Sequence, residues 1–418
     1  MKIAIIGTGI SGLVAAYYLQ QHEITVFEAN AYIGGHTHTH ELQTLEGAVA
    51  VDSGFIVFNE ENYPHFSALL KQLGVASQPS NMSFSVSNRN TGLEYNAASL
   101  DTLFCQRSNL LNPQFYRMIL DIKRFYRESP ALLETTENND ICLDDYLREN
   151  RYSKIFTEHH LYPMVAALWS APPQIVGQFP LRYLIRFMHH HKMLQINHRP
   201  EWRTVTGGSA SYIKAMTQSF RQRIRLNTPV SSIIRNAKGV SIVSDGHEPE
   251  HFDKVFIACH SDQALKLLQK PSATETEVLG AIPYQRNEMV LHSDISVMPR
   301  HRKAWASWNV RVSAGSEHRC SVTYYMNLLQ SLKSDTDFFV SLNPEVKINP
   351  EHIWKQAVYH HPVYTQETVR AQQRYHEING QQHSYYCGAY WGWGFHEDGV
   401  RSALTALDSF NHGLQQVA

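Results

Sequence analysis

The chain has 418 residues, which is long enough for two domains with sizeable hydrophobic cores. Its formal net charge is −1, so it has no overall basic field for nucleic acid, and we expect no nucleic-acid partner. The five cysteines are scattered and never in CxxC spacing, which argues against a disulfide framework and indicates a reducing compartment. The apolar run at residues 3–19 precedes no small-residue cleavage pattern and is shorter than the roughly 20 residues of a membrane span. We therefore predict a cytoplasmic protein.

The chain opens with a pattern typical of a parallel βαβ unit. Residues 2–6 form a short apolar run, as a buried strand does, and residues 11–21 have apolar side chains at helical spacing. Residues 24–29 predict a second strand that ends in an acidic residue, Glu28. Two strands joined by a helix imply a right-handed crossover and a parallel sheet.

The rest of the chain predicts further helices and a second sheet. Residues 63–75 and 112–129 carry apolar residues at helical spacing, and residues 223–245 indicate two strands separated by a turn. Residues 254–260 form another apolar strand, whereas the alternating patterns at 284–345 favour a mostly antiparallel sheet. The chain ends in a predicted helix at 399–414. Because no repeat or low-complexity linker separates these parts, we expect interleaved domains.

Three glycines follow the first strand in GxGxxG spacing. These are Gly7, Gly9 and Gly12, and Glu28 closes the next strand 21 residues after Gly7. In this context, the first glycine allows a tight turn, the second lets the backbone approach a pyrophosphate, and the third permits close packing of helix and strand. Glu28 would accept hydrogen bonds from a ribose. The segment predicts a dinucleotide site.

The stretch "YIGGHTHTH" at residues 32–40 carries histidines at alternate positions. In an extended strand, His36, His38 and His40 would share one face and could hold zinc. No acidic or cysteine partner is evident, and the two glycines before them fit a second nucleotide-binding loop. We therefore predict no metal site.

The sequence around this loop resembles the flavoprotein superfamily of amine oxidases, phytoene desaturases and protoporphyrinogen oxidases. Gly34 and Gly35 match its double glycine, His36 stands where an arginine is usual, and Thr37 matches the following hydroxyl residue. The segments "TVTGGSASYIKAM", "LNTPVSSI", "VFIACHSDQAL" and "YYCGAYWGWGFHEDGVRSALTAL" also resemble superfamily motifs. Across the whole chain, the sequence is most similar to bacterial predicted NAD/FAD-binding proteins, which are often encoded near cyclopropane-fatty-acid synthases.

This resemblance implies an α/β fold in which a Rossmann-like FAD-binding domain with a parallel sheet is interleaved with a substrate domain of antiparallel sheet plus helices. The FAD-binding domain is expected at 1–75, 201–270 and 371–418, the helical substrate part at 76–200 and the antiparallel part at 271–370. FAD is expected to bind non-covalently. Cys387 offers an alternative, covalent attachment, but a buried thiol is favoured over it.

The resemblance also implies a set of residues that contact FAD. They are Gly7, Gly9, Ile10, Ser11, Gly12, Glu28, Ala29, Gly34, Gly35, His36, Thr37, Gly54, Phe55, Val230, Gly388, Glu397, Gly399 and Val400.

The leading functional hypothesis is an FAD-dependent oxidoreductase that dehydrogenates or desaturates a CH–CH bond of a lipid acyl chain. Tyr390, Trp391 and Trp393 are the candidate catalytic residues, as an aromatic wall beside the substrate, with plain packing as the alternative. His260 is a second catalytic candidate or a loop cap. The cationic segment 180–194 could form a lipid-facing lip at the cavity entrance, hence a peripheral membrane contact, or a partly buried helix. Two alternatives stay open: oxidation of an amine, and a flavin-binding partner of a lipid-modifying enzyme.

Overall fold

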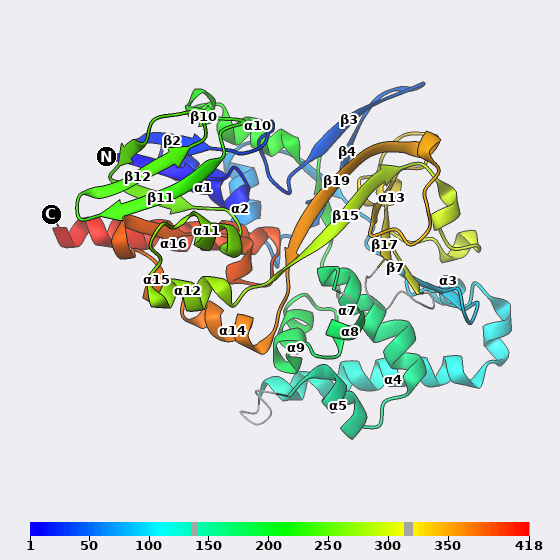
Figure 1. Ribbon diagram of the computed structural model, residues 1–418. Helices are drawn as coiled ribbons and strands as arrows, with labels where there is room; N and C mark the ends of the chain where they lie inside the picture. Colours follow the sequence, from blue (N-terminus) through cyan, green and yellow to red (C-terminus); the bar gives the residue numbers. More distant parts are fainter. Residues whose placement is uncertain (135–140, 172, 313–320, 418) are drawn as a thin grey trace.

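A computed structural model of the chain describes residues 1–134, 141–171, 173–312 and 321–417. The molecule has two lobes (Figure 1). One lobe holds a parallel sheet and both termini, and the other holds a larger sheet and most of the helices between residues 100 and 191. Two long strands, β15 (Tyr284–His292) and β19 (Ile353–Pro362), pair antiparallel with each other, so that β15 begins and β19 ends between the lobes. The expected fold class is confirmed, whereas the five domain ranges stay a prediction.

The parallel sheet has five strands in the order β10–β2–β1–β14–β20. Helix α1 (Ile10–Tyr18) connects β1 to β2, so the predicted βαβ unit is confirmed. The last four residues of β1 are buried, because packed elements cover both faces of the sheet. The strand bounds are Lys2–Ile6 (β1), Glu23–Phe27 (β2), Ile224–Arg225 (β10), Lys254–Ile257 (β14) and Ser384–Tyr386 (β20).

Different elements cover the two faces of this sheet. On one face, Ile3 and Ile5 share a core cluster with residues of α1 and of α16 (His396–Val417). On the other face, Ala4 and Ile6 share a cluster with a three-stranded sheet, β11 (Val230–Asn236), β12 (Gly239–Ser244) and β13 (Glu250–Phe252). Segment 223–245 therefore contains the predicted pair of strands, β11 and β12. It also contains β10, which is too short to show a pattern.

The second sheet has seven strands in the order β19–β15–β18–β17–β16–β7–β8. All neighbouring strands are antiparallel except β16 and β7, which pair in parallel although 220 residues separate Trp308 from Asn88. The antiparallel sheet expected from residues 284–345 is thus present. The remaining strand bounds are Phe84–Asn88 (β7), Glu94–Asn96 (β8), Trp308–Val312 (β16), Ser321–Tyr325 (β17) and Phe339–Leu342 (β18).

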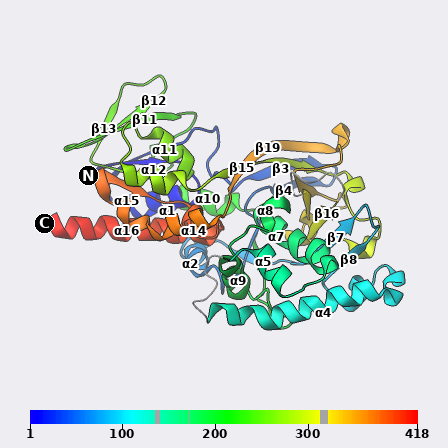
Figure 2. The ribbon, with the colours of Figure 1, turned by 60° about the horizontal axis from the view of Figure 1, so that its bottom comes forward.

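Helices pack beside this sheet and complete the second lobe. They include α4 (Pro113–Glu128), α5 (Leu143–Glu149), α7 (Tyr162–Trp169) and α9 (Leu181–His190). Figure 2 shows α4 along the outer edge of this lobe. Six of the ten residues of α9 are buried in the largest core cluster, so its apolar face is not available to lipid. The lipid-facing lip expected at 180–194 is therefore wrong, and the alternative of a packed helix holds.

The other elements are short, and several of them, such as α2 (Pro64–Gln72) and α10 (Ala210–Thr217), contribute to the core of the first lobe. Among the described residues, no helix is both long and apolar enough to cross a membrane. The bounds of the strands are Thr39–Thr44 (β3), Gly47–Asp52 (β4), Val57–Phe58 (β5), Ser77–Pro79 (β6) and Arg203–Val205 (β9). Those of the other helices are Leu100–Leu103 (α3), Lys154–Phe156 (α6), Pro173–Val176 (α8), Ser261–Leu267 (α11), Ala273–Gly280 (α12), Met326–Leu329 (α13), Gln366–Gln373 (α14) and Tyr375–Ile378 (α15).

Candidate functional site

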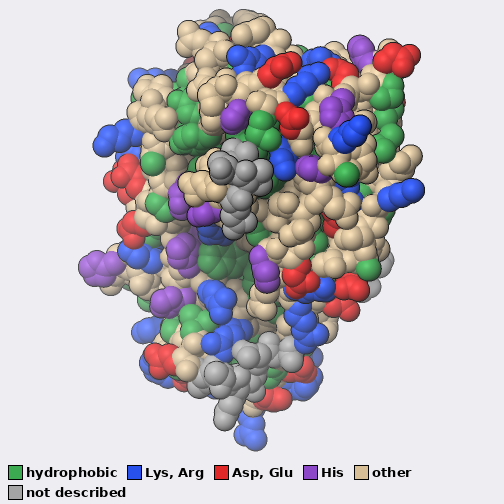
Figure 3. Space-filling view, turned by 90° about the vertical axis from the view of Figure 1, so that its left-hand side faces the viewer, with side chains coloured by type: hydrophobic (Ala, Val, Ile, Leu, Met, Phe, Trp, Pro, Cys, Tyr) green, Lys and Arg blue, Asp and Glu red, His purple; other side chains and the backbone are tan. Residues whose placement is uncertain are grey.

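A cavity of about 1380 Å³ runs from the parallel sheet of the first lobe into the second lobe. Its wall includes residues of the glycine-rich turn after β1, of strand β19, and of the helices α4, α7 and α9. On the face shown in Figure 3, a hollow with a hydrophobic floor is bordered by His and by Lys or Arg side chains. The volume exceeds the roughly 300–1,000 Å³ of an ordinary ligand pocket. There is room for more than one ligand.

The turn between β1 and α1 has the backbone that its three glycines predict. Gly7 has a positive φ of 101°, which only glycine adopts readily. A Cβ on Gly12 would lie 2.0 Å from the Gly7 carbonyl oxygen, so this residue lets helix and strand pack closely. Around Gly9, no atom lies within 4 Å of the place where a Cβ would stand, and Gly9 lines the cavity. The N-terminus of α1 thus faces open space in which an anion could bind.

Glu28 lies on the cavity wall at the end of β2 and is buried. Its Oε2 accepts hydrogen bonds from the Thr8 amide at 2.9 Å and the Thr8 hydroxyl at 2.5 Å. Its Oε1 accepts two more, from the backbone and side-chain amides of Asn30, both at 2.8 Å. A ribose hydroxyl would therefore have to replace one of these four donors. Sequence reasoning missed Thr8 and Asn30, although Thr8 stands inside the glycine motif.

The second glycine loop touches the first. A Cβ on Gly35 would lie 3.1 Å from the Cα of Gly9, so the two loops come together at the cavity wall. The backbone at Gly54 also packs closely against this loop, because a Cβ there would lie 2.0 Å from the His36 carbonyl oxygen. The Thr37 hydroxyl lies 2.5 Å from the Tyr212 hydroxyl. These contacts bring together residues that the sequence spreads from 9 to 212.

The three alternate histidines do not converge on one point. His36 lines the cavity and packs against Tyr359, with ring centroids 4.9 Å apart, whereas His40 Nε2 lies 2.8 Å from the Ser53 hydroxyl. His38 stacks on Tyr32 at 4.1 Å. Because β3 begins only at Thr39, the alternation of a strand does not extend back to His36. Within the described ranges of the chain, no group of three His, Cys, Asp or Glu residues could hold a metal ion.

His36 is a neutral imidazole in this position. Burial, followed by the nearby His260 and His360, lowers the pKa of His36 to about 3. Its Nε2 is buried and has no hydrogen-bond partner in the protein. Such an orphaned polar atom on a cavity wall is costly unless a ligand supplies the partner.

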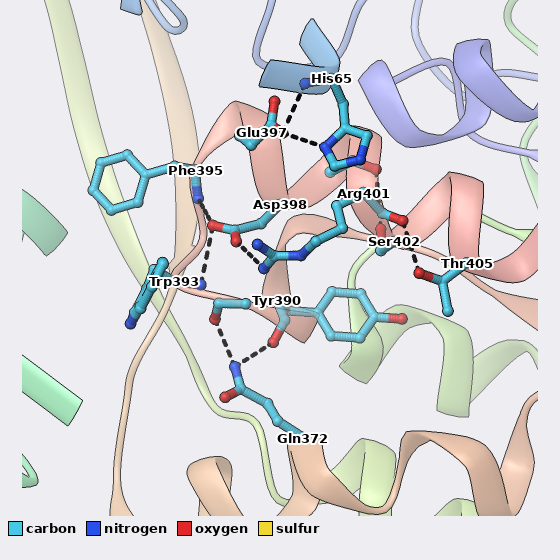
Figure 4. A network of polar contacts seen from close by, with 12 residues as sticks. His65, Gln372, Tyr390, Trp393, Phe395, Glu397, Asp398, Arg401, Ser402 and Thr405 are labelled. Carbon is cyan, nitrogen blue, oxygen red and sulfur yellow. Dashed lines mark hydrogen bonds and ion pairs between the residues drawn. The ribbon is translucent and has the colours of Figure 1, made fainter. Parts of the chain in front are cut away.

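The C-terminal motif forms a polar network beside the cavity (Figure 4). The Glu397 carboxylate accepts hydrogen bonds from the backbone amides of His65 at 3.0 Å and Phe66 at 2.9 Å, in the first turn of α2. The Asp398 carboxylate accepts hydrogen bonds from the backbone amides of Trp393 and Phe395, both at 3.0 Å. Glu397 thus caps a helix and does not line the cavity, because both of its oxygens point to α2. The flavin contact predicted for it has no support from this position.

Two of the three candidate catalytic aromatics also lie away from the cavity. Tyr390 lines it, but Trp391 packs against Tyr375 with ring centroids 4.7 Å apart. Trp393 packs against residues of α9, including Phe187 at 5.7 Å. The expected wall of three aromatics is therefore reduced to Tyr390, because the two indoles fill gaps between elements. For Trp391 and Trp393, the alternative of plain packing agrees with these contacts.

The structure gathers most of the residues predicted to contact FAD on one cavity wall. The exceptions are Gly12, Glu397, Gly399 and Val400. A Cβ on Gly399 would lie 2.7 Å from Ile10 Cγ2, and the Ser11 hydroxyl donates to the Gly399 carbonyl at 2.9 Å, so this residue lets α16 approach α1. Those on the wall are Gly7, Gly9, Ile10, Ser11, Glu28, Ala29, Gly34, Gly35, His36, Thr37, Gly54, Phe55, Val230 and Gly388.

Sequence reasoning missed His396, which stacks on the predicted residue Phe55. Their ring centroids are 3.7 Å apart with planes at 10°, and His396 Nε2 lies 2.8 Å from the Tyr212 hydroxyl. Burial lowers the pKa of His396 to about 3, so the ring is neutral. The chain Thr37–Tyr212–His396 thus links the second glycine loop to the C-terminal motif. His396 stands two residues after Gly394 in the C-terminal motif, and this position was the signal in the sequence that could have identified it.

His260, the other catalytic candidate, also lines the cavity. It stacks on Tyr284 at 4.5 Å and immediately precedes α11, so it both lines the cavity and caps a loop. His360 and His361 of β19 lie on the same wall, and the His361 ring is 5.5 Å from His36. Burial lowers the pKa of both His260 and His361, to about 4 and about 3. This wall is therefore rich in neutral imidazoles.

The part of the cavity in the second lobe is mostly apolar. Its wall includes Phe84, Met164, Trp169, Phe187, Trp308 and Tyr324. Cationic side chains join the wall at Lys192, which pairs with Glu61, and at the exposed Arg199, whose Nε donates to the Gln195 carbonyl at 2.9 Å. An apolar chamber with cations on its wall suits an uncharged or anionic ligand with an apolar body.

Comparisons with known proteins agree with this geometry. The curated L-amino-acid oxidase of Siganus canaliculatus is 24% identical over 308 residues, which cover 69% of this chain and 56% of that protein. The chain thus spans about half the length of the curated relatives it matches. Among solved structures, cyclohexylamine oxidase from Brevibacterium oxydans IH-35A has a TM-score of 0.72 at 16% identity, with 99% of each chain covered.

A second solved structure, the CLA-producing fatty acid isomerase from P. acnes, has a TM-score of 0.68 at 13% identity, with 98% of each chain covered. At these identities, the likeness shows the fold alone. The model of the family described as flavin containing amine oxidoreductase matches residues 10–290, which is more than half of the chain. The chain therefore belongs to the family of flavin-containing amine oxidoreductases.

Proposed function

We propose that this protein is an FAD-dependent oxidoreductase whose substrate binds in the apolar part of the cavity. The observation that carries the proposal is that one cavity joins two parts of the site. One part is lined by the glycine loops at Gly7–Gly9 and Gly34–Gly35, which we name the cradle, and the other is the apolar chamber in the second lobe. A dinucleotide in the cradle and a substrate in the chamber would meet without an intervening wall. Bound FAD would supply the hydride acceptor that the chain's own side chains lack.

The residues of the cradle fit FAD. The space beside Gly9 and the N-terminus of α1 suit the pyrophosphate, and a ribose hydroxyl would bind Glu28 by replacing one of its four protein donors. The orphaned Nε2 of His36 supports a polar ligand atom on this wall. Because a neutral imidazole binds phosphate less strongly than the usual arginine, the backbone amides would carry more of the binding.

We propose that FAD is held without a covalent bond. Cys387 is fully buried and absent from the cavity wall, and burial raises the pKa of its thiol. A buried thiol with a raised pKa is a poor nucleophile. Acid precipitation tests this directly, because a covalent flavin would stay with the pellet.

We propose that the substrate carries an acyl chain and loses hydrogen from a CH–CH bond. The aromatic and aliphatic wall would bury the chain and exclude water, and the cation of Arg199 would attract a carboxylate or another anionic head. The substrate would give a hydride to bound FAD and a proton to water, and oxygen or an electron carrier would be the final acceptor of the two electrons. We also propose that this protein has a lipid-modifying enzyme as a partner.

Oxidation of an amine is the second candidate. The chain's family and the names of its relatives favour it, and an uncharged amine with an apolar body would also fit the chamber. The aromatic side chains Tyr390 and Phe395 on the cavity wall would suit either substrate.

Anaerobic reduction of the flavin distinguishes these candidates. The purified yellow protein would be mixed, without oxygen, with free fatty acids, phospholipids or primary amines, and the flavin absorbance followed. Bleaching by acyl compounds supports the first candidate, and bleaching by amines the second. If no compound bleaches the flavin, the proposal of turnover fails and a flavin-binding partner of another enzyme is favoured.

A further inference from the structure

Five large apolar side chains lie exposed on one segment of the second lobe. Together they form what we name the α3–α4 patch: Leu100, Leu110, Leu111, Tyr116 and Leu120. Leu111 is 90% exposed, Leu100 76% and Leu120 61%, so none of the three contributes to the core. The patch contains five of the twelve large apolar side chains that the described part of the chain exposes. Single exposed leucines are ordinary, but a group of them marks an interaction surface.

The members of the patch are neighbours in space. The Tyr116 hydroxyl donates to the Leu110 carbonyl at 3.0 Å, and Tyr116 and Leu120 lie one turn apart on α4. Phe104 ends the turn of α3 that carries Leu100, and its ring lies 5.9 Å from that of Tyr116, so α3 packs beside the start of α4. A turn of 3₁₀ helix at Arg107–Leu111 carries Leu110 and Leu111 at its end. The patch thus gathers on two neighbouring helical segments and the turn between them.

Basic side chains are interleaved with these apolar ones. Residues 99–128 include five basic and three acidic residues, and Asp121 is buried, which leaves two acidic side chains at the surface. Lys123 and Arg127 follow Tyr116 and Leu120 at helical spacing on the exposed side of α4. Arg107 and Lys303 border Leu100, where both pair with Asp101. Arg127 pairs with Glu128 and Arg117 with Asp121, so the segment keeps a net positive charge although most of its basic side chains are ion-paired.

We propose that the α3–α4 patch binds the surface of an anionic lipid bilayer. Leucines that protrude from a turn and a helix would insert among the acyl chains, while the neighbouring arginines and lysines would reach the lipid phosphates. The core of a protein interface is depleted of charged residues and protein interfaces are depleted of lysine, whereas the patch has a net positive charge and is bordered by Lys123 and Lys303. Charge complementarity therefore favours the bilayer over a protein partner or a second copy of this chain.

The position of the patch also connects it with the cavity. Ala97 and Ala98, immediately before α3, line the cavity, and so does Tyr126, near the end of α4. The segment that carries the patch thus reaches the cavity wall at both ends. A bilayer bound there would lie close to segments that contribute to the cavity wall. Binding to the bilayer itself does not depend on the proposed chemistry.

Co-sedimentation with vesicles tests the proposal. The FAD-loaded protein would be mixed with vesicles of phosphatidylcholine alone or of equal parts phosphatidylcholine and phosphatidylglycerol. We expect binding to the anionic vesicles, and the double variant Leu111→Asp/Leu120→Asp should weaken it by at least about tenfold. The matched control is Leu45→Asp, at the exposed turn between β3 and β4, which should leave binding unchanged. Lys123→Glu/Arg127→Glu should weaken binding most at low salt.

Three results would overturn the proposal. They are absence of wild-type binding to anionic vesicles, equal binding by the patch variant and the Leu45 control, and a concentration-dependent dimer that Leu111→Asp abolishes while vesicles bind neither protein. Circular dichroism and FAD content would show that each variant is folded, since every substituted side chain is exposed. Flavin bleaching by substrate in solution would be unaffected, so failure of this test is distinct from failure of the proposed function.

Discussion

The Glu397 carboxylate lies on the first turn of α2, 3.0 Å from the backbone nitrogen of His65, although 332 residues separate the two in the chain. It also accepts a hydrogen bond from the His65 ring nitrogen Nδ1, at 2.6 Å. Helix α2 has no capping side chain of its own, and Pro64 occupies its first turn. A carboxylate from α16 thus satisfies amides that would otherwise be unpaired and holds the two helices together.

Replacement of Glu397 should therefore destabilise the fold. We expect Glu397→Ala to lower the free energy of unfolding by about 1–2 kcal/mol, the usual range for loss of a helix cap. Chemical denaturation at neutral pH measures this, with the exposed Glu41→Gln as the control. A variant that unfolds like wild type but no longer retains FAD would show that Glu397 acts on the cofactor instead.

The glycines of the first turn should respond differently to an added methyl group. Gly12→Ala would force a Cβ to 2.0 Å from the Gly7 oxygen, so we expect a loss of stability of about 1–3 kcal/mol. In Gly9→Ala, the methyl group meets no protein atom and enters the space for the pyrophosphate. This variant should fold normally but bind FAD more weakly, as measured by calorimetric titration. Equal losses of stability in both variants would contradict the proposal that the space beside Gly9 holds the pyrophosphate.

His36 and His40 should have different effects on FAD retention. His36 has a buried ring nitrogen without a protein partner, whereas His40 already bonds Ser53. We expect His36→Ala to weaken FAD binding roughly tenfold, as does the loss of one polar contact to a charged group. His40→Ala should leave it unchanged. FAD released on gel filtration measures both, and equal retention by the two variants would exclude a contact from His36.

His292 should make the protein sensitive to acid. Its Nδ1 accepts the Asp294 amide at 3.1 Å, Nε2 lies 2.8 Å from the Ser341 hydroxyl, and burial lowers its pKa to about 4. Since the unfolded chain binds the proton more tightly, stability is present above pH 6.5 and is lost as the pH falls towards 4.

The variant His292→Asn tests this, because it keeps an acceptor near the place of Nδ1 without a titrating ring. Its free energy of unfolding should fall less than that of wild type between pH 6.5 and 4, by about 1 kcal/mol or more. His376→Asn, at an exposed position, is the control. Parallel curves for wild type and His292→Asn would contradict the assignment.

The first lobe could largely be predicted because its signals are local. The β1–α1–β2 unit follows from apolar runs and glycine spacing within 30 residues, and α2 follows from helical periodicity, as does α4 in the second lobe. Pairings between distant segments could not be predicted: the parallel contact of β7 with β16 depends on the whole second lobe. Short strands such as β10 have too few residues to show a period.

For the site, glycine geometry could be predicted but the direction of side chains could not. Gly7, Gly9 and Gly35 act through the conformation and close approach of their backbone, so their spacing in the sequence predicts the cradle. Trp391 and Glu397 lie within a few residues of the cavity, yet one packs on Tyr375 and the other caps α2. Which way such residues point depends on neighbours that come from distant parts of the chain.

The central claim is that the cradle holds one FAD per chain beside the apolar chamber. The most direct measurement is the flavin content of the purified protein, from its absorbance spectrum before and after reconstitution with FAD. We predict one FAD per chain, released into the supernatant by acid. A colourless protein that takes up no FAD would contradict the account.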